Sequence, residues 1–148
     1  MYRVRGGVLE VLLAHPGGPF WKKKDEGAWT IPKGEIESGC DPLSEACREF
    51  QEETGIQPAP PFRALGSIVQ KSGKTVHGWA FQGDCDPVAI RSNMAEIEWP
   101  ARSGKKMLVP EIDRAEFFTV EEAAKKINPA QTPFLKALAE IVRNAHPV

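Results

Sequence analysis

The chain has 148 residues, of which 41% are hydrophobic and 26% charged, and its formal net charge is −1. This length suits one domain with a buried core, so we expect a single domain over residues 1–148. A nearly neutral chain offers no basic field for a nucleic-acid backbone, which excludes a polymeric DNA or RNA partner from our expectations.

Compartment and membrane association are judged from the same composition. No apolar run is long enough to span a bilayer and no signal-peptide core is visible, so we expect no membrane partner. The cysteines are three in number and show no CxxC spacing. That pattern argues against a disulfide framework or a zinc site and favours a cytoplasmic protein.

The first part of the chain predicts a strand pair followed by a long loop. Gly6 and Gly7 indicate a hairpin turn. The run VLEVLLA at residues 8–14 is nearly continuous in apolar residues, which is typical of a strand buried on both faces. The following loop, residues 16–27, is rich in glycine, proline and lysine. Its three consecutive lysines, residues 22–24, either steer an anionic ligand or form a solvated surface.

A helix is predicted after a short strand at residues 29–32. Asp41 is placed to cap its start, Pro42 suits its first turn, and Gly55 suits its end. Four apolar residues recur at helical spacing and would face a core. They are Leu43, Ala46, Cys47 and Phe50.

Three carboxylates mark the same helix. Glu49, Glu52 and Glu53 are three and four residues apart, so they share one face, one turn apart. Like charges at this spacing repel by roughly 0.2–0.5 kcal/mol per pair, which a solvated surface helix tolerates, so the spacing alone decides nothing. A glycine-containing loop precedes the helix and could lend a carbonyl beside them. Oxygen ligands of this kind suit Mg²⁺ or Mn²⁺ rather than zinc.

The second half of the chain predicts a hairpin, a short edge strand, a final strand and two helices. Their expected ranges are 62–70 and 74–82 for the hairpin, 97–100 for the edge strand, 114–118 for the final strand, and 120 onward and 130–145 for the helices. Thr119 is placed to cap the first of these helices. Interleaved strands and helices in this order predict an α/β fold with a mixed β-sheet between helices.

The stretch from Gly34 to Ile56 resembles the Nudix box, which runs Gly, five residues, Glu, seven residues, then Arg-Glu-apolar-any-Glu-Glu-any-Gly-apolar. Gly34 opens it, and residues 48–56 (REFQEETGI) match every defined position of its second half. Cys40 stands where the pattern has its first Glu. The resemblance implies a Nudix-type α/β/α sandwich. The family usually carries a complete strand before the first turn, and with only residues 1–4 there we expect that strand to be truncated.

The resemblance also implies a chemistry: Mg²⁺-dependent (or Mn²⁺-dependent) hydrolysis of a nucleoside diphosphate linked to another moiety. The metal site would comprise the Gly34 carbonyl with Glu49, Glu52 and Glu53. Arg48 would pair with a box carboxylate and fix its orientation, a surface ion pair being the alternative.

A general base often lies outside the box in this family. Glu111 is our candidate, because it precedes the final strand in a loop that could reach the metal site. Glu116, Glu98 and Glu49 are alternatives.

The expected partner is a small nucleotide. The sequence Trp-Thr-Ile-Pro-Lys-Gly at residues 29–34 is similar to the subgroup acting on dinucleoside polyphosphates, and Lys33, where others have Gly, could contact an extra phosphate. A nucleoside triphosphate is a further option. Trp79, Trp21 or Phe20 could stack on a base, although aromatic residues of this kind more often belong to the core.

Cys40 is the feature that favours an alternative, a catalytically weak Nudix-fold nucleotide sensor. A Glu at this position would brace the box through its Arg, and a thiol cannot replace that charge. Glu37 or Asp41 could substitute for it.

Overall fold

The computed structural model describes residues 1–32 and 39–145. The expectations on Lys33, Gly34 and Glu37 therefore lie outside the described residues. The strands are β1 (Tyr2–Arg5), β2 (Val8–Pro16), β3 (Arg63–Val69), β4 (Thr75–Ala80), β5 (Met94–Glu98), β6 (Lys106–Pro110) and β7 (Ile112–Thr119). The helices are α1 (Pro42–Thr54), α2 (Val120–Lys126) and α3 (Thr132–Ala145).

The strands pair in three antiparallel groups, and a parallel contact joins the first two of them. The groups are β1-β2-β7, β3-β4 and β5-β6. The Tyr2 N–H donates to the Phe81 carbonyl at 3.0 Å, and the Gly83 N–H donates to the Tyr2 carbonyl at 2.9 Å. This contact is a parallel bridge between Tyr2 and Gln82, just beyond the end of β4. Parallel and antiparallel contacts together give the mixed sheet that the sequence predicts.

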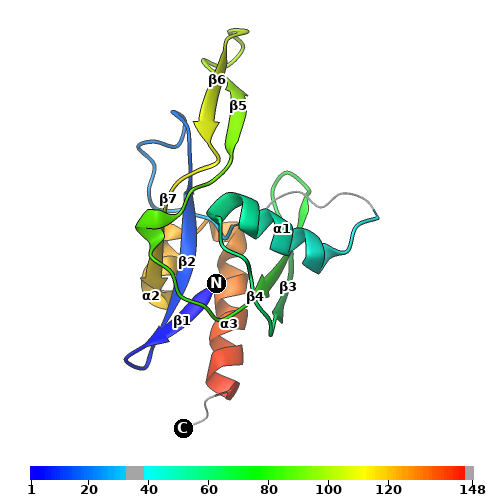
Figure 1. The fold of residues 1–148 in the computed structure, drawn as a ribbon, viewed down its shortest axis with the longest axis vertical. Helices are drawn as coiled ribbons and strands as arrows, with labels where there is room; N and C mark the ends of the chain where they lie inside the picture. The colour runs from blue at the N-terminus through cyan, green and yellow to red at the C-terminus, as the bar shows by residue number, and fades with distance from the viewer. Residues whose placement is uncertain (33–38, 146–148) are drawn as a thin grey trace.

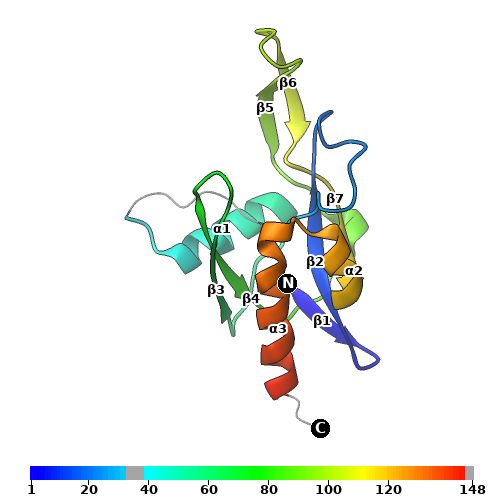
Figure 2. The same ribbon diagram turned by 180° about the vertical axis from the view of Figure 1, so that it is seen from behind.

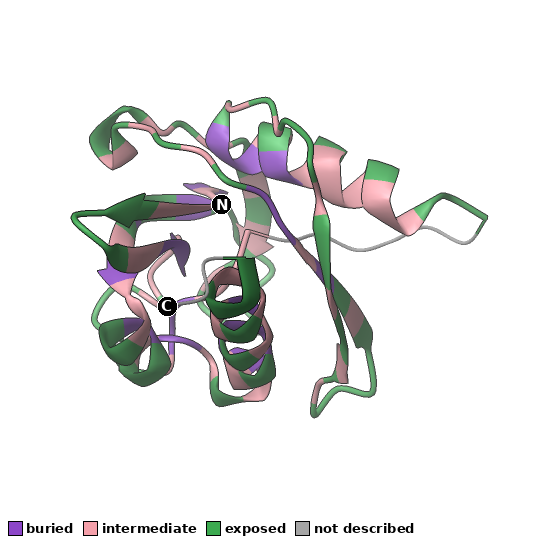
Figure 3. Cartoon of the chain, turned by 90° about the horizontal axis from the view of Figure 1, so that it is seen from below, coloured by how far each residue is buried: buried purple, intermediate pink, exposed green. Residues whose placement is uncertain are grey.

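Helices cover both faces of this sheet, α1 on one side and α2 and α3 on the other (Figures 1 and 3). Alternate residues of β2 serve the two sides. Leu12 belongs to one buried cluster with Phe50 of α1. Val11 and Leu13 belong to another, with Leu135 of α3. The prediction of a strand buried on both faces is therefore confirmed, and so is the α/β/α layering.

The caps of α1 form as the sequence predicts. The Asp41 carboxylate accepts a hydrogen bond from the Ser44 N–H at 3.0 Å, and Gly55 adopts the left-handed conformation with φ at 77°. The apolar stripe of α1 is only partly buried. Phe50 is buried, while Leu43, Ala46 and Cys47 are half-buried.

The short strand expected at residues 29–32 is reduced to two isolated bridges at its start. Trp29 pairs in parallel with Ile127. Thr30 exchanges two backbone hydrogen bonds with Ala14, at 2.8 and 2.9 Å, and the pairing stops there. The Ile31 N–H donates instead to the side-chain Oε1 of fully buried Gln131, at 3.0 Å. Pro32 has no N–H to offer a ladder. A side chain from the 3-10 turn just before α3 thus holds this segment ahead of the box.

The region around residues 84–110 also differs from expectation. The edge strand expected at 97–100 is one arm of a hairpin, β5–β6, which projects from the rest of the molecule (Figures 1 and 2). Its ladder pairs Glu98 with Lys106 next to a turn in which Arg102 has a positive φ of 61°. The C-terminal helix begins at Thr132, two residues late, because residues 129–131 form a 3-10 turn. Among the described residues, none of the helices is long and apolar enough to cross a membrane.

The cap of α1 yields a stability test. We expect Asp41→Ala to lower the free energy of unfolding by about 1 kcal/mol, because the Ser44 N–H loses its acceptor. Asp41→Asn keeps an acceptor oxygen and should lose only a small part of that amount. Urea denaturation of both variants measures the difference, and equal stabilities would contradict the capping role.

Candidate active site

Arg48 lies at the centre of a carboxylate cluster on α1. Its guanidinium donates to Glu45 at 2.5 Å, to Glu49 at 2.9 Å and to Glu52 at 2.8 Å. Two of these partners lie three and four residues away, where the helix brings side chains together. Arg48 thus holds two of the predicted metal ligands, which agrees with its expected pairing. Glu45 is a partner that the sequence reading missed, although its i,i+3 spacing to Arg48 was visible.

The cluster carries more negative than positive charge, and this affects Glu49 most. Desolvation raises the pKa of Glu49, and the nearby charges of Glu52 and Glu111 add to that rise, while Arg48 opposes it. Glu45 behaves in the opposite way, because its bond to Arg48 lowers its pKa. Three carboxylates around one guanidinium leave a net negative charge, which favours a cation.

The three predicted ligands differ in exposure. The Glu49 side chain is 17% exposed and that of Glu52 is 41% exposed. Glu53 is buried, with 9% of its surface exposed. The three carboxylates that the spacing puts on one face are therefore not equally solvated, because the position of Glu53 on the helix turns it toward the body of the protein.

Backbone hydrogen bonds bring the Glu111 loop to the end of α1. The Asn93 N–H donates to the Glu52 carbonyl at 3.2 Å, and the Glu111 N–H donates to the Asn93 carbonyl at 2.9 Å. Gly17 donates to the Glu111 carbonyl at 3.1 Å. A Cβ on Gly17 would lie 2.0 Å from the Pro110 carbonyl oxygen, so this approach requires glycine. Glu111 itself is exposed and close enough to influence Glu49.

The structure places the two rivals of Glu111 elsewhere. Glu98 ends β5 beside the turn of the projecting hairpin (Figure 1). Glu116 pairs with Leu13 in the β2–β7 ladder and so shares its sheet face, which is turned away from α1. Neither lies beside Arg48.

Cys40 is exposed and contacts the cluster through Glu45. The hydrogen bond to Arg48 is the main cause of the lowered pKa of Glu45, and desolvation opposes it. A hydrogen bond with the Cys40 thiol adds a smaller lowering. Asp41 accepts from both the N–H and the hydroxyl of Ser44, at 3.0 and 2.9 Å, so its carboxylate serves the cap. Glu37 or Asp41 was expected to replace the first Glu of the box as a partner of Arg48. Among the described residues, Glu45 rather than Asp41 bonds to Arg48 in this way.

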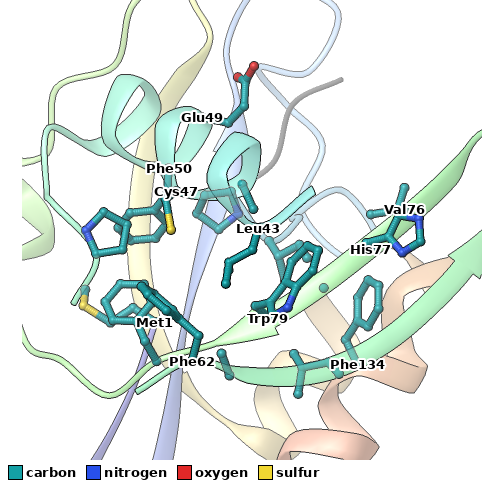
Figure 4. A pocket seen from close by; sticks show the side chains of 18 of the residues that line it. Met1, Leu43, Cys47, Glu49, Phe50, Phe62, Val76, His77, Trp79 and Phe134 are labelled. Atoms are coloured by element: carbon teal, nitrogen blue, oxygen red, sulfur yellow. The ribbon is translucent and has the colours of Figure 1, made fainter. Parts of the chain in front are cut away.

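Aromatic residues proposed to stack on a base lie in two places. Trp79 is half-buried and lines a cavity of about 600 Å³ beneath α1, with its ring 6.2 Å from that of His77 (Figure 4). Phe20 and Trp21 pack edge to face at 5.0 Å in the lysine-rich loop. The Lys24 ammonium lies 3.7 Å from the centre of the Phe20 ring, so this lysine is engaged within its own loop.

The donor set on α1 is made of carboxylate oxygens, which fits Mg²⁺ or Mn²⁺. Over residues 1–32 and 39–145, three or more His, Cys, Asp or Glu side chains nowhere converge as a ready metal cluster. Glu49 and Glu52 both accept hydrogen bonds from Arg48.

Comparison with known proteins agrees with the fold and the box. The family described as NUDIX domain matches residues 1–138. The chain is 40% identical over 69 residues to the bis(5'-nucleosyl)-tetraphosphatase (asymmetrical) of Rattus norvegicus, covering 43% of this chain and 47% of that protein. It thus spans about half the length of that relative.

Two solved structures share the fold. The Ap4A hydrolase of C. elegans, in a binary complex, has a TM-score of 0.62 at 21% identity, covering 97% of this chain and 93% of the other. The NUDIX domain of Shewanella oneidensis NrtR complexed with ADP ribose has a TM-score of 0.63 at 14% identity, covering 95% and 82%. The fold is that of a Nudix protein. The chain belongs to the NUDIX domain family.

The opposite pKa shifts of Glu49 and Glu45 predict opposite stability effects. A raised pKa means that the folded state binds its proton more tightly, so Glu49 costs stability once the pH exceeds its folded pKa. We expect Glu49→Gln to melt about 1–3 °C above wild type at pH 7 without divalent ions, with no difference near pH 3.5. Glu45→Gln removes a carboxylate whose pKa the hydrogen bond to Arg48 lowers, so this variant should melt below wild type at pH 7. Melting curves from pH 3.5 to 7.5 test both signs, and a shared sign would contradict the assignment.

Cys40→Glu tests whether the box still needs its first carboxylate. Because Cys40 is exposed, we expect the new carboxylate to change the free energy of unfolding by less than about 1 kcal/mol. Because Glu45 already holds Arg48, we expect turnover to stay within about twofold of wild type. A large rise in kcat would show instead that Glu45 replaces the missing carboxylate poorly.

Proposed function

We propose that this protein is a divalent-metal-dependent pyrophosphohydrolase that cleaves a nucleoside diphosphate linked to another moiety. The observation that carries the proposal is the bonding of Arg48 to Glu45, Glu49 and Glu52 on the box helix of a NUDIX-family chain. A surface ion pair would need only one partner, whereas this arrangement concentrates acidic oxygens beside a second loop.

The residues that would hold the metal are Glu49, Glu52, Glu53 and the Gly34 carbonyl. Bound Mg²⁺ or Mn²⁺ would neutralise the pyrophosphate and lower the pKa of a bound water. Arg48 would keep the carboxylates of Glu49 and Glu52 positioned and offset part of their mutual repulsion.

Glu111 would act as the general base. The bonds that tie its loop to the C-terminal half of α1 support this role, as does its electrostatic influence on Glu49. A base must reach the proton that it removes, directly or through one water, and Glu111 is exposed at the cluster. Glu49 is the alternative base, because its raised pKa favours proton uptake.

A dinucleoside polyphosphate is the substrate that we favour, with a nucleoside triphosphate as second choice. The names of the rat tetraphosphatase and of the C. elegans Ap4A hydrolase support this choice. Trp79 would stack on a base and Lys33 would contact an additional phosphate. We further propose a cytoplasmic location, where such nucleotides occur.

A nucleotide sensor without turnover is the alternative. The NUDIX domain of NrtR was solved with ADP ribose, and its fold matches this chain. Cys40 in the box favours a sensor, but the carboxylate cluster around Arg48 favours an enzyme, because a sensor has no need of a metal site poised for hydrolysis.

Substrate screening with mass detection of products tests the proposal. Ap4A, ATP and ADP-ribose are incubated with Mg²⁺, with Mn²⁺ or with EDTA. We expect hydrolysis only with metal, and we expect Glu52→Gln and Glu53→Gln each to lower kcat by about a hundredfold. Glu140→Gln, an exposed change on α3, is the matched control.

Thermal melts distinguish the outcomes. Near wild-type kcat in a folded Glu52→Gln variant would refute the ligand assignment. Tight nucleotide binding without any product would establish the sensor instead.

A further inference from the structure

His15 is a buried histidine for which the proposed mechanism has no role. It lies near the end of β2 with 0% of its surface exposed. Its Nδ1 lies 2.9 Å from the Asp113 carboxylate, and its Nε2 lies 2.6 Å from the Lys24 carbonyl oxygen. Both neighbours are acceptors, so an imidazolium can donate to both and a neutral ring to only one. One buried side chain thus joins β2 to β7 and to the loop of residues 16–27.

Asp113 forms a β-bulge in β7, because the ladder with β2 passes over it. Arg114 pairs with His15, and the next pair joins Ile112 to Pro16. Adjacent residues of a regular strand point to opposite faces, so a regular β7 would turn Asp113 away from His15. Bulges redirect side chains in this way and are common beside active sites. The bond between Asp113 and His15 therefore depends on the bulge and holds it in turn.

The bulge also sets the position of Glu111, the proposed general base. It shifts the pairing by one residue, so Gly17 lies opposite Glu111 and donates to its carbonyl at 3.1 Å. A regular ladder would place Gly17 opposite Ile112 instead. The register that brings Glu111 to the end of α1 is therefore the bulged one.

The second partner of His15, a loop carbonyl, fixes the loop of residues 16–27 at the same point. The next side chain of the loop, Asp25, accepts from the Trp29 indole at 2.8 Å and bonds to Lys126 of α2. The Trp29 ring packs edge to face on His15, with ring centres 5.2 Å apart. Both ends of the loop are therefore anchored beside the buried histidine.

Arg114 is the other charged neighbour of Asp113. Its Nε lies 4.0 Å from the carboxylate, and its side chain is 51% exposed. A long and exposed ion pair of this kind contributes little. His15 lies closer and is fully buried, so His15 rather than Arg114 holds the carboxylate in place.

We propose that His15 is a positioning residue for the reaction: through Asp113 it holds the β7 bulge, and thereby fixes Glu111 beside the box helix. The inference rests on the proposed function, in which Glu111 is the general base. A reacting group displaced by about 1 Å can lose roughly a hundredfold in rate. Ground-state binding of the substrate does not depend on the base, so His15 acts on kcat rather than on KM.

Hydrogen exchange at the Gly17 amide, followed by NMR, tests the hold on the bulge without an activity assay. His15→Phe keeps an aromatic ring but offers no N–H, and Asp113→Ala removes the acceptor. Asp113→Asn keeps an acceptor oxygen and is the conservative variant. Arg114→Gln is the matched control, because it removes the other charged neighbour. The Gly55 amide, which bonds within α1, is the internal reference.

We expect His15→Phe and Asp113→Ala each to speed exchange at Gly17 by at least about tenfold, with Gly55 unchanged. Asp113→Asn and Arg114→Gln should stay within about threefold of wild type. Unchanged exchange in both His15→Phe and Asp113→Ala would overturn the proposal. So would an equal acceleration by Arg114→Gln.

Kinetics with Ap4A and Mg²⁺ test the effect on the reaction. We expect His15→Phe to lower kcat by at least about tenfold with KM within about twofold, and Asp113→Asn to keep most of the rate. In a Glu111→Gln background, His15→Phe should cost no more than about twofold further, because the residue through which it acts is already absent. Additive losses in that double variant, or a raised KM at unchanged kcat, would overturn the proposal.

Failure of the proposed function would give a different result. Near wild-type kcat in Glu111→Gln would refute the proposed base, and a complete absence of Ap4A hydrolysis in the wild-type protein would refute the favoured substrate. In either case, the exchange rate at Gly17 in the His15→Phe and Asp113→Ala variants still decides whether His15 holds the bulge.

Discussion

The ion pairs of Arg48 are the interaction on which the candidate site depends. One guanidinium joins three carboxylates across nearly two turns of α1, and without it their repulsion would act unopposed. Each pair is partly exposed and contributes little to stability alone. Together they fix which way the acidic side chains point. The arrangement is better explained as preorganisation of a charged site than as support for the fold.

That preorganisation requires a well-ordered helix. The capped ends of α1 hold it in place more than the packing of its buried face does. Asp41 and Gly55 define where it starts and stops, and the Glu52 carbonyl bonds to the Asn93 loop. Beneath it, Phe50 packs against Phe81 with ring centres 5.1 Å apart, while Cys47 stays half-buried beside the cavity under the helix. On its buried face the helix therefore relies mainly on Phe50.

Local features of the fold were predictable from sequence, and features that depend on distant partners were not. Both caps of α1, the 49-52-53 spacing and the β3–β4 hairpin follow from residues within a few positions of each other. The burial of Glu53 could not be predicted, because it depends on elements far along the chain. The strand expected at residues 29–32 stops after Thr30 for the same reason, since Gln131, a hundred positions away, accepts from the Ile31 N–H. The bonding of Glu45 to Arg48 is also a local feature, because side chains three residues apart meet on a helix.

The unfavourable electrostatics of the carboxylate cluster are related to the metal binding that we propose for it. Glu49 is held in a place that disfavours its charge, between desolvation and the fields of Glu52 and Glu111. A site with this property gains most when a cation arrives, because the same carboxylates that repel each other then share a ligand. The raised pKa of Glu49 and the proposed metal requirement therefore have one cause. An acidic surface helix without a function would instead leave its carboxylates solvated, whereas the Glu49 side chain is 17% exposed and Glu53 is 9% exposed.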